Sequence, residues 1–428
     1  MRNLFSLLAT LATIAAACGS DGTNPAASDP VESTSPEAVL VELTPIESTA
    51  GRADADPNAP TDDLVDGFTN IGFDLLRDQP SEQNAVLSPA SIGHATLMLR
   101  PAADAVTGAA IDEALALPDG LAAHEAWNRI DRLIRDANGT VEGDDGATPV
   151  VTIADRIWPT QNANPDQEWV DLLTTYHGAD VSLIDNQAPE ASRNTINGWV
   201  SDQTQGLIPE LIPPNVIKTD TTLVLTDAVY FEAAWTGNPS FGSNEFRGFD
   251  GSSNLVPFVE TDESSRFGTG DGWTASILPY SGRDFSMLFL VPDVGRFDEI
   301  REDLSAPFLA ELDASLENEF YALQFPQWED DTNINLLPWL SEIGAAPGAY
   351  PGIGSSPPSR LGAGVHAADI AVDEEGTIAA AATALVGTAM EDSGEPNFTF
   401  TVDRPFFYLI RHNDSGLVLF AGQVTDLS

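Results

Sequence analysis

The stretch DEEGTIAAAATALVGTAMED, residues 373–392, decides the fold, because fifteen consecutive residues from Gly376 to Met390 carry no charge. The segment stands apart in a chain with 18 basic and 66 acidic residues and a net charge of −48. Its alanines favour a helix, whereas its β-branched residues and flanking glycines favour a strand. Read as a strand, both faces carry only small or aliphatic side chains, which a sheet can bury without an unpaired charge or overpacking. The stretch therefore predicts an exposed loop that can become a buried strand.

The sequence around this loop predicts an α+β fold with large antiparallel or mixed sheets. Apolar residues recur at helical spacing from Leu64, where we expect the folded domain to begin, and a second helical pattern covers residues 122–137. Four apolar runs are typical of strands: VVTIADRIW from residue 150, TTLVLTDAVYF from 221, SMLFLVP from 286 and PFFYLIRH from 405.

Composition limits the classes of partner. With 428 residues, 42% of them hydrophobic, the chain can bury a large core as a globular protein. The charge of −48 repels nucleic acid, heparin-like polyanions and anionic lipid surfaces, so we expect none of them as partners. The single cysteine allows no intramolecular disulfide, and stability must come from packing.

The N-terminus reads as an export signal followed by a tether. Residues 1–18 hold one arginine, an apolar run and small residues before Cys18, an arrangement that resembles the lipobox of bacterial lipoproteins. Lipidation of Cys18 and cleavage to a soluble secreted form remain alternatives. Both predict an extracellular or cell-surface protein whose contact with a membrane is limited to an N-terminal lipid anchor. The composition of residues 19–61 predicts a disordered acidic linker, and residues 62–428 form the folded domain.

Conventional enzyme motifs are absent from the sequence. The five histidines lie far apart along the chain, with no HExxH pair and no cysteine near them to complete a zinc site. There is no GxSxG nucleophile elbow and no phosphate-binding glycine loop. We therefore expect no enzyme, no metal and no cofactor, and a secreted hydrolase is only a distant alternative.

The run DEEGTIAAAATA, followed by DRPFFYLIRHNDSGLVLFAGQV from residue 403, closely resembles the reactive-loop hinge and C-terminal strands of serpins, the serine protease inhibitors that act by loop insertion. Matching segments appear in family order over residues 64–428: NAVLSPASIGHATLML at 84, INGWVSDQTQGLIPELI at 196, ILPYSGRDFSMLFLVP at 277 and HAADIAVDEEG at 366. The resemblance implies the serpin fold, with large mixed or antiparallel sheets, about eight or nine helices and an exposed reactive-centre loop at about 374–396. It also implies a monomer.

The resemblance also implies a mechanism of suicide inhibition. A serine protease attacks the loop and forms an acyl-enzyme; the cleaved loop then inserts into the central sheet and traps the protease as a covalent complex. A native state held above its most stable form by a kinetic barrier is needed for this. A non-inhibitory serpin fold, cut as an ordinary substrate or acting as a binding protein, is the alternative.

Individual loop residues match the family pattern of inhibitory members. The hinge matches Glu374, Glu375, Gly376 and Thr377, and the small-residue stretch that follows matches Ala379, Ala380, Ala381 and Ala382. The family's spacing from the hinge glutamate to the reactive bond ends at Met390, which predicts cleavage between Met390 and Glu391. The distance from Met390 to the following strand is longer than usual and leaves Thr388 and Ala389 as alternatives.

The residue before the bond predicts the class of target. Met390 suits the apolar primary pocket of chymotrypsin-, elastase- or subtilisin-like proteases and not the acidic pocket of trypsin. Glu391 and Asp392 after the bond would repel many proteases. Cysteine proteases also form acyl-enzymes and remain alternative targets.

Two supporting regions also match the family. The shutter beneath the opening sheet matches Ser88, Pro89, Ser91 and His366, and the breach, where the loop first enters, matches Trp235. The shutter histidine normally meets an asparagine, but this chain has Asp227, so we expect a carboxylate facing His366 and a loop-insertion rate that depends on pH.

Overall fold

The computed structural model describes residues 40–138, 149–236, 239–354, 358–377 and 395–428, which belong to one unit. Within them, the helices are α1 (Thr61–Arg77), α2 (Pro89–Leu99), η1 (Arg100–Ala102), α3 (Ala105–Ala114), α4 (Ala122–Ala137), α5 (Gln167–Leu172), η2 (Leu173–His177), α6 (Pro189–Gln203), α7 (Phe297–Asp303), α8 (Ala306–Ser315), α9 (Leu337–Glu342) and η3 (Pro351–Ile353). Nine are α-helices, in agreement with the α+β prediction, and none in this part of the chain is long and apolar enough to cross a membrane.

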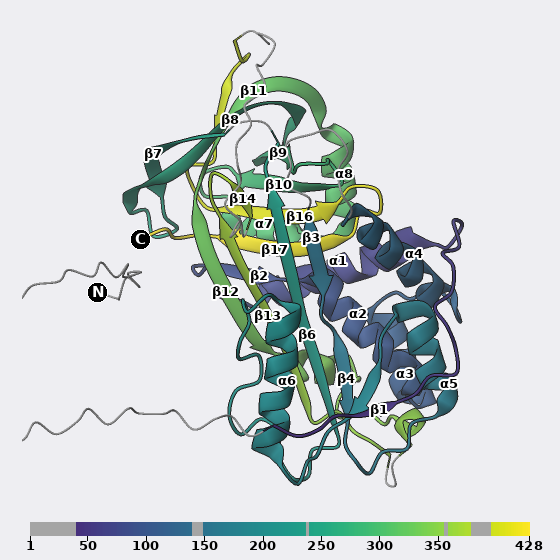
Figure 1. Cartoon of the computed structure of the whole chain (residues 1–428). Coiled ribbons are helices and arrows are strands. Elements are labelled where there is room, and N and C mark those ends of the chain that lie inside the picture. Colours follow the sequence, from purple (N-terminus) through teal and green to yellow (C-terminus); the bar gives the residue numbers. More distant parts are fainter. Residues whose placement is uncertain (1–39, 139–148, 237–238, 355–357, 378–394) are drawn as a thin grey trace, which may run out of the picture. The chain divides into compact units, whose positions relative to one another are not determined.

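The strands form three sheets (Figure 1). A six-stranded sheet contains β3 (Val150–Ile153), β4 (Arg156–Pro159), β6 (Leu223–Ala234), β12 (Trp328–Asn335), β13 (Ala363–Val372) and β14 (Gly376–Thr377). A nine-stranded sheet contains β2 (Ala85–Leu87), β7 (Ser240–Arg247), β8 (Ser253–Gly270), β9 (Trp273–Pro279), β10 (Phe285–Pro292), β11 (Glu317–Pro326), β15 (Thr399–Thr401), β16 (Phe406–His412) and β17 (Val418–Val424). A small two-stranded sheet pairs β1 (Thr44–Ile46) with β5 (Val181–Leu183).

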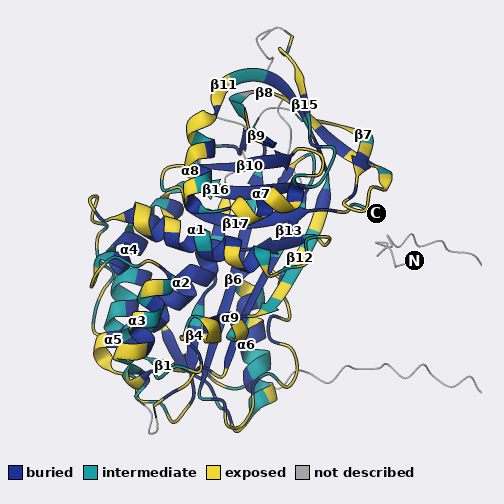
Figure 2. Ribbon diagram, turned by 180° about the vertical axis from the view of Figure 1, so that it is seen from behind, coloured by how far each residue is buried: buried dark blue, intermediate teal, exposed yellow. Residues whose placement is uncertain are grey.

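The two faces of the six-stranded sheet are covered by different elements. On one face, α6 and the loop that follows it pack on alternate residues of β6 and β13, among them Val224, Ala228 and Val365. The other face packs on α2, all of whose residues are buried, and on the nine-stranded sheet (Figure 2). Because successive strand residues point to opposite faces, Asp227 of β6 and His366 of β13 point toward α2.

The predicted elements largely form where the sequence places them. The helical pattern at 122–137 is α4, and the apolar runs at 221, 286 and 405 are β6, β10 and β16. The run VVTIADRIW is an exception, because it forms two strands, β3 and β4, separated by Ala154 and Asp155. The Asp155 carboxylate is buried against α2, and this inward polar contact interrupts what the apolar residues alone predict as one strand.

The predicted linker at 19–61 is wrong for its second half, since residues from 40 onward contact the folded domain. β1 pairs antiparallel with β5, with Thr44 opposite Leu183. Two hydroxyl groups, of Ser48 and Thr49, donate hydrogen bonds to the Asp171 carboxylate at 2.8 and 2.6 Å. Composition indicated a solvated tether, but a few specific hydrogen bonds order this segment. Residues 1–39, which include Cys18, lie outside the described residues.

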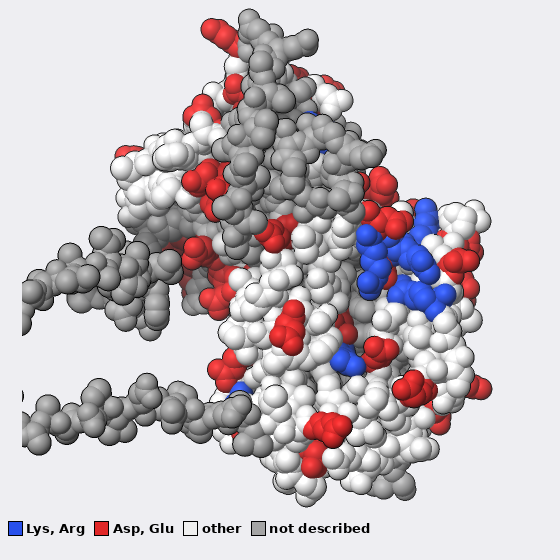
Figure 3. Space-filling model, in the orientation of Figure 1, with Lys and Arg blue, Asp and Glu red and all other residues white. Residues whose placement is uncertain are grey.

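The arginines of α4 attach the same N-terminal segment to the domain. Arg52 pairs with Asp131 of α4 at 2.7 Å, and the side chains of Arg129 and Arg132 donate to two backbone carbonyls of the segment. Arg129 and Arg132 belong to α4, and Figure 3 shows a blue patch in the region of this helix, on a face with scattered acids. The guanidinium groups are thus bonded to the chain's own oxygen atoms.

Candidate functional site

The candidate site is the line along which β6 and β13 face each other, which we call the seam. The two strands pair in parallel, with Ala363 opposite Val224 and Ala367 opposite Ala228. Farther along they part, and the chain leaving β13 turns back as β14 and pairs with both of them. Thr377 lies opposite Ala233 of β6 and Val372 of β13. The first residues of the predicted loop therefore already occupy a strand position inside the sheet.

The turn before β14 is held by hydrogen bonds to backbone and side-chain groups. The Asp373 carboxylate accepts hydrogen bonds from the backbone amides of Glu375 and Gly376 at 2.8 and 3.1 Å. The Gln327 amide donates to the Glu374 carboxylate at 2.5 Å. Glu374 thus has a neutral partner across the strands, and the turn has a defined geometry before the strand begins.

Gly376 occupies a place with no room for a side chain. A Cβ at this position would lie 2.1 Å from the backbone oxygen of Ala233 and 2.8 Å from the Cα of Ala234. Real Cβ atoms do not approach other atoms so closely, and the obstacle here is backbone that cannot rotate away. The hinge glycine therefore allows β14 to lie against β6.

Two aromatic side chains, those of Trp235 and Tyr280, contact the turn that leads into β14. Trp235, which is 3% exposed, donates from its indole nitrogen to the Asp373 carbonyl at 2.8 Å. Its ring stacks on Tyr280 with centroids 4.5 Å apart and an interplanar angle of 12°. The Tyr280 hydroxyl lies 2.6 Å from the Thr377 hydroxyl, and both residues are fully buried. Trp235, predicted to belong to the breach, thus lies beside the turn that leads into β14.

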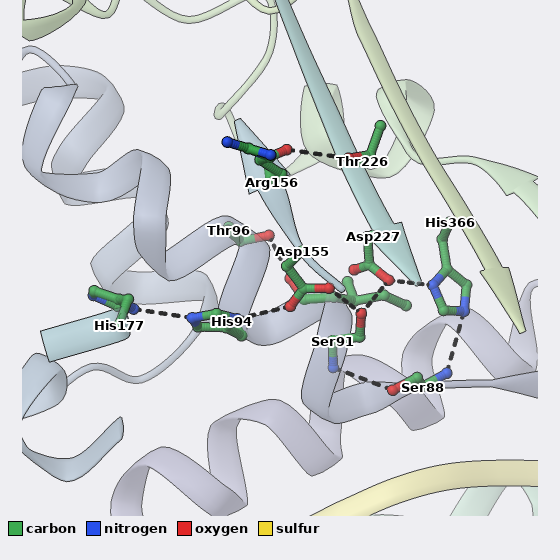
Figure 4. A network of polar contacts seen from close by, with 11 residues as sticks. Ser88, Ser91, His94, Thr96, Asp155, Arg156, His177, Thr226, Asp227 and His366 are labelled. Carbon is green, nitrogen blue, oxygen red and sulfur yellow. Dashed lines mark hydrogen bonds and ion pairs between the residues drawn. The ribbon is translucent and has the colours of Figure 1, made fainter. Parts of the chain in front are cut away.

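Midway along the seam, a fully buried histidine faces a fully buried carboxylate (Figure 4). His366 and Asp227 are paired residues of β13 and β6, and the distance from His366 Nδ1 to Asp227 Oδ1 is 2.5 Å. The backbone amide of Ser88 donates to His366 Nε2 at 3.2 Å. Since Nε2 is an acceptor, the proton of the neutral ring is on Nδ1 and is donated to Asp227. Asp227 Oδ2 has no partner in the described part of the chain.

Ser91 connects this pair to a second buried acid, Asp155. The single Ser91 hydroxyl lies within hydrogen-bonding distance of Asp227 Oδ1 and Asp155 Oδ1. A hydroxyl can donate one hydrogen, so one of the two acids must itself donate to Ser91. Burial, followed by the charge of Asp227, raises the pKa of Asp155 well above its ordinary range. We therefore assign the proton to Asp155, and Asp227 accepts from both Ser91 and His366.

A row of three histidines continues the network away from the seam. His94 Nδ1 lies 2.7 Å from Asp155 Oδ2, His94 Nε2 lies 3.0 Å from His177 Nδ1, and His177 Nε2 lies 2.9 Å from His124 Nδ1. Burial holds the pKa values of His94 and His177 well below the ordinary range and lowers the pKa of His124 to about 4. All three are neutral near pH 7, and each ring donates one hydrogen along the row.

The five histidines lie far apart along the sequence, but three of them contact one another in the folded chain. They belong to α2, α4 and η2, and no sequence pattern links these elements. Within the described residues no group of three or more histidine, cysteine or acidic side chains could hold a metal ion. The row is thus a chain of hydrogen bonds. It extends the predicted shutter by four buried residues: Asp155, His94, His124 and His177.

Ser88, Ser91, Asp227 and His366 come together at the seam as one contact network, and Pro89 begins α2 directly after Ser88, whose side chain caps that helix. Glu374, Glu375, Gly376, Thr377 and Trp235 form the hinge end. Ala379, Ala380, Ala381, Ala382, Met390 and Glu391 lie outside the described residues. Sequence reasoning missed Tyr280 and Asp155, and only the charge inside an apolar run could have indicated the second.

Comparisons with known proteins agree with this architecture. The model of the serpin family, described as serine protease inhibitor, matches residues 66–427. The human leukocyte elastase inhibitor is 28% identical over 387 residues, covering 84% of this chain and 98% of its own. A probable non-inhibitory serpin, Z9 of Oryza sativa subsp. japonica, is 28% identical over 302 residues, covering 65% of this chain and 67% of its own.

Solved structures show the same fold. The native-state crystal structure of the thermophilic serpin tengpin has a TM-score of 0.77 at 21% identity, covering 90% of this chain and 100% of that chain. The chain described here belongs to the serpin family. Proteins of this family generally have proteases as partners, but its relatives include both inhibitory and non-inhibitory members.

Proposed function

We propose that this protein is a suicide-type inhibitor of a serine protease and that its cleaved loop inserts along the seam between β6 and β13. The observation that carries the proposal is β14, because Gly376 and Thr377 already pair with β6 and Thr377 also pairs with β13. Insertion would extend this short strand. The uncharged residues that follow in the sequence suit a buried strand, since each unpaired charge would cost several kcal/mol.

In the proposed reaction, the nucleophile of the protease attacks the carbonyl carbon of Met390. The bond between Met390 and Glu391 breaks, the amine of Glu391 takes up a proton and leaves, and the Met390 carbonyl stays on the protease as an ester. Strand insertion then competes with hydrolysis of that ester. The protein itself supplies no catalytic group in this scheme and acts as inhibitor, not enzyme.

The proposed targets have apolar primary pockets, as in chymotrypsin, elastase and subtilisin. Met390 supports this choice, and a relative named as an elastase inhibitor is compatible with it. A cysteine protease would form a thioester at the same carbonyl and is an alternative target.

The test uses protein without residues 1–18, incubated with chymotrypsin, elastase, subtilisin or trypsin and run on a denaturing gel after boiling. We expect a band at the summed mass with an apolar-pocket protease and, by mass spectrometry, a released peptide that begins at Glu391. In a matched variant, Met390→Arg, trypsin should become a target. Cleavage of the loop by every active protease without such a band would instead support a non-inhibitory serpin.

We further propose that the mature protein is held outside the cell by a lipid on Cys18. The sequence of residues 1–18 supports this, as it resembles a lipoprotein signal. Growth of producing cells with a labelled fatty acid should label the protein, and Cys18→Ser should remain unlabelled. Unlabelled wild-type protein in the medium would support the soluble secreted form.

A further inference from the structure

The hinge contains a pair of hydroxyl groups, those of Thr377 and Tyr280. Tyr280 belongs to the turn after β9, far from the loop in sequence, and its hydroxyl oxygen lies 2.6 Å from Thr377 Oγ1. Both side chains are fully buried, and within the described residues neither hydroxyl has another recorded hydrogen-bond partner. Each hydroxyl therefore depends on the other, because a buried hydroxyl without a partner is destabilising.

The position of the Tyr280 hydroxyl is fixed by the rings around it. Trp235 stacks on Tyr280, and Phe231 packs edge-on at 5.0 Å between centroids. Residues next to the ring are bonded to the end of β6, since Ser281 donates from its backbone amide to Ala234 at 2.8 Å. The tyrosine is thus a rigid part of the sheet, and the hinge must bring its own hydroxyl to meet it.

Trp235 and Tyr280 together contact the hinge on both sides of its turn. Trp235 donates to the carbonyl of Asp373 before the turn, and Tyr280 meets Thr377 after it. A slip of the hinge by one residue would point Thr377 to the opposite face of the sheet and leave the Tyr280 hydroxyl without a partner, because successive strand residues face opposite sides. The pair of aromatic residues therefore specifies the register.

We propose that Tyr280 is a positioning residue that fixes Thr377 as the first residue of the inserting strand through the bond between their hydroxyl groups. The inference rests on the proposed inhibitory function and names the contact that starts insertion. A strand that starts in register lengthens without rearrangement. A hinge released from the sheet must first bury the Thr377 hydroxyl again. Because this delays insertion, the acyl-enzyme has more time to hydrolyse.

The experiment compares Tyr280→Phe, Thr377→Val and the double variant with wild type. One readout is the number of inhibitor molecules consumed for each protease trapped. The second, which needs no protease, is backbone hydrogen exchange in the segment from Asp373 to Thr377. We expect each single variant to raise consumption and exchange roughly 3- to 10-fold, the factor that corresponds to one hydrogen bond.

The double variant distinguishes the hydroxyl pair from general damage to packing. Each single variant leaves one buried hydroxyl unpaired, whereas the double variant leaves none, so its effect should be smaller than the product of the two. The matched control is Tyr408→Phe, because Tyr408 is also fully buried but its hydroxyl has no partner in the described part of the chain. This control should behave as wild type in both readouts.

Each outcome of the experiment decides between defined alternatives. Single variants that match wild type in both readouts, or effects that multiply in the double variant, would overturn the role of Tyr280. Wild type that is cut without forming a complex would refute the proposed function instead. In that case the exchange measurement still decides whether Tyr280 holds Thr377 in the sheet.

Discussion

The hinge end of the seam and the shutter midway along it are closed by different kinds of chemistry. At the hinge, Thr377 is held by the neutral hydroxyl of Tyr280, and Gly376 fits closely against the backbone of β6. At the shutter, β13 and β6 are joined by His366 and Asp227, which continue into a buried network of acids and histidines. The acids and histidines at the shutter are titratable side chains, whereas the threonine hydroxyl at the hinge is not, and a tyrosine hydroxyl ordinarily ionises only at about pH 10.

This difference separates two properties that a trapping protein needs. In the proposed mechanism the hinge determines where insertion starts, through the fit of Gly376 and the neutral hydroxyl pair of Tyr280 and Thr377, neither of which changes charge between pH 5 and 8. The shutter determines how strongly the two strands hold together and how stable the native domain is, through buried titratable groups whose energies vary with pH. Changes at the hinge should therefore affect trapping at every pH, and changes at the shutter should alter the pH profile.

The largest effect is expected from Gly376→Val at the hinge. The added side chain would overlap the backbone of Ala233 and keep β14 out of the sheet. We expect about 100-fold less covalent complex, the factor that corresponds to roughly 3 kcal/mol, at every pH from 5 to 8. Quantification of the boiled complex on gels checks this. The matched control is Gly242→Ala on β7, where a Cβ meets nothing within 4 Å, and a normal yield of complex from Gly376→Val would refute a steric role for this glycine.

The next effect concerns stability and belongs to the shutter network. Burial lowers the pKa of His124 to about 4, from an ordinary value of 6.5. The unfolded chain therefore binds a proton between these values that the folded chain does not, and the stabilisation present above pH 6.5 is lost as the pH falls toward 4. This shift corresponds to about 3 kcal/mol.

The variant His124→Gln tests this linkage. It loses a hydrogen bond to His177 and should be less stable than wild type at pH 7.5, but it has no buried histidine to protonate at this position. The difference in free energy of unfolding should therefore shrink or reverse at pH 4.5, as measured by urea denaturation. Parallel curves for the two proteins at both pH values would show that His124 contributes nothing to acid sensitivity.

The sequence predicts the hinge better than the shutter network, and the reason is physical. The hinge is a continuous segment, and its uncharged, small-residue pattern follows from what a buried strand requires. The resemblance to serpins also placed Asp227 opposite His366, and the structure has this pair. The remaining network comes from α2, α4, η2 and the break between β3 and β4, so only the tertiary fold brings its members together.

The N-terminal segment shows the same limit of local reasoning. The composition of residues 40–60 is that of a tether, yet Arg52 and Thr49 find partners on α4 and α5. Tyr280 is comparable, since nothing in the turn that contains it indicates contact with a loop nearly one hundred residues away. Patterns predicted the elements, and contacts between distant elements had to be observed.

A smaller effect, of a few fold, is expected in the pH dependence of trapping. His366 Nε2 accepts from the backbone amide of Ser88, so a hydrogen at this nitrogen would require α2 to move away from β13. The charged groups that face His366 are Asp227 on β6 and, through Ser91, the acid pair with Asp155. We therefore expect the rate of trapping to change between pH 5 and 8.

Stopped-flow measurement of complex formation checks this profile, with Asp227→Asn as the comparison. The amide can still accept from His366 but carries no charge, and the profile should flatten. The variant Tyr280→Phe should be slower but keep the wild-type dependence on pH. A flat wild-type profile between pH 5 and 8 would refute pH control by the shutter, and an altered profile in Tyr280→Phe would remove the distinction between the hinge and the shutter.

The smallest effect, a change in the stability of the fold, is expected from Asp155→Asn, although this substitution replaces a buried acid. If Asp155 holds the proton that Ser91 accepts, then asparagine has the same hydrogen-bonding pattern, because its amide donates to Ser91 and its oxygen accepts from His94. Stability near pH 6 should change by less than about 1 kcal/mol.

Burial raises the pKa of Asp155 above its ordinary 3.8. The folded chain therefore keeps a proton that the unfolded chain releases above that value, and wild type loses stability as the pH rises. The asparagine variant should lose less, and urea denaturation between pH 6 and 9 measures this. A large loss at pH 6 would mean that Asp155 is ionised and that the proton belongs to Asp227, which reverses the assignment on which the shutter end of the comparison depends.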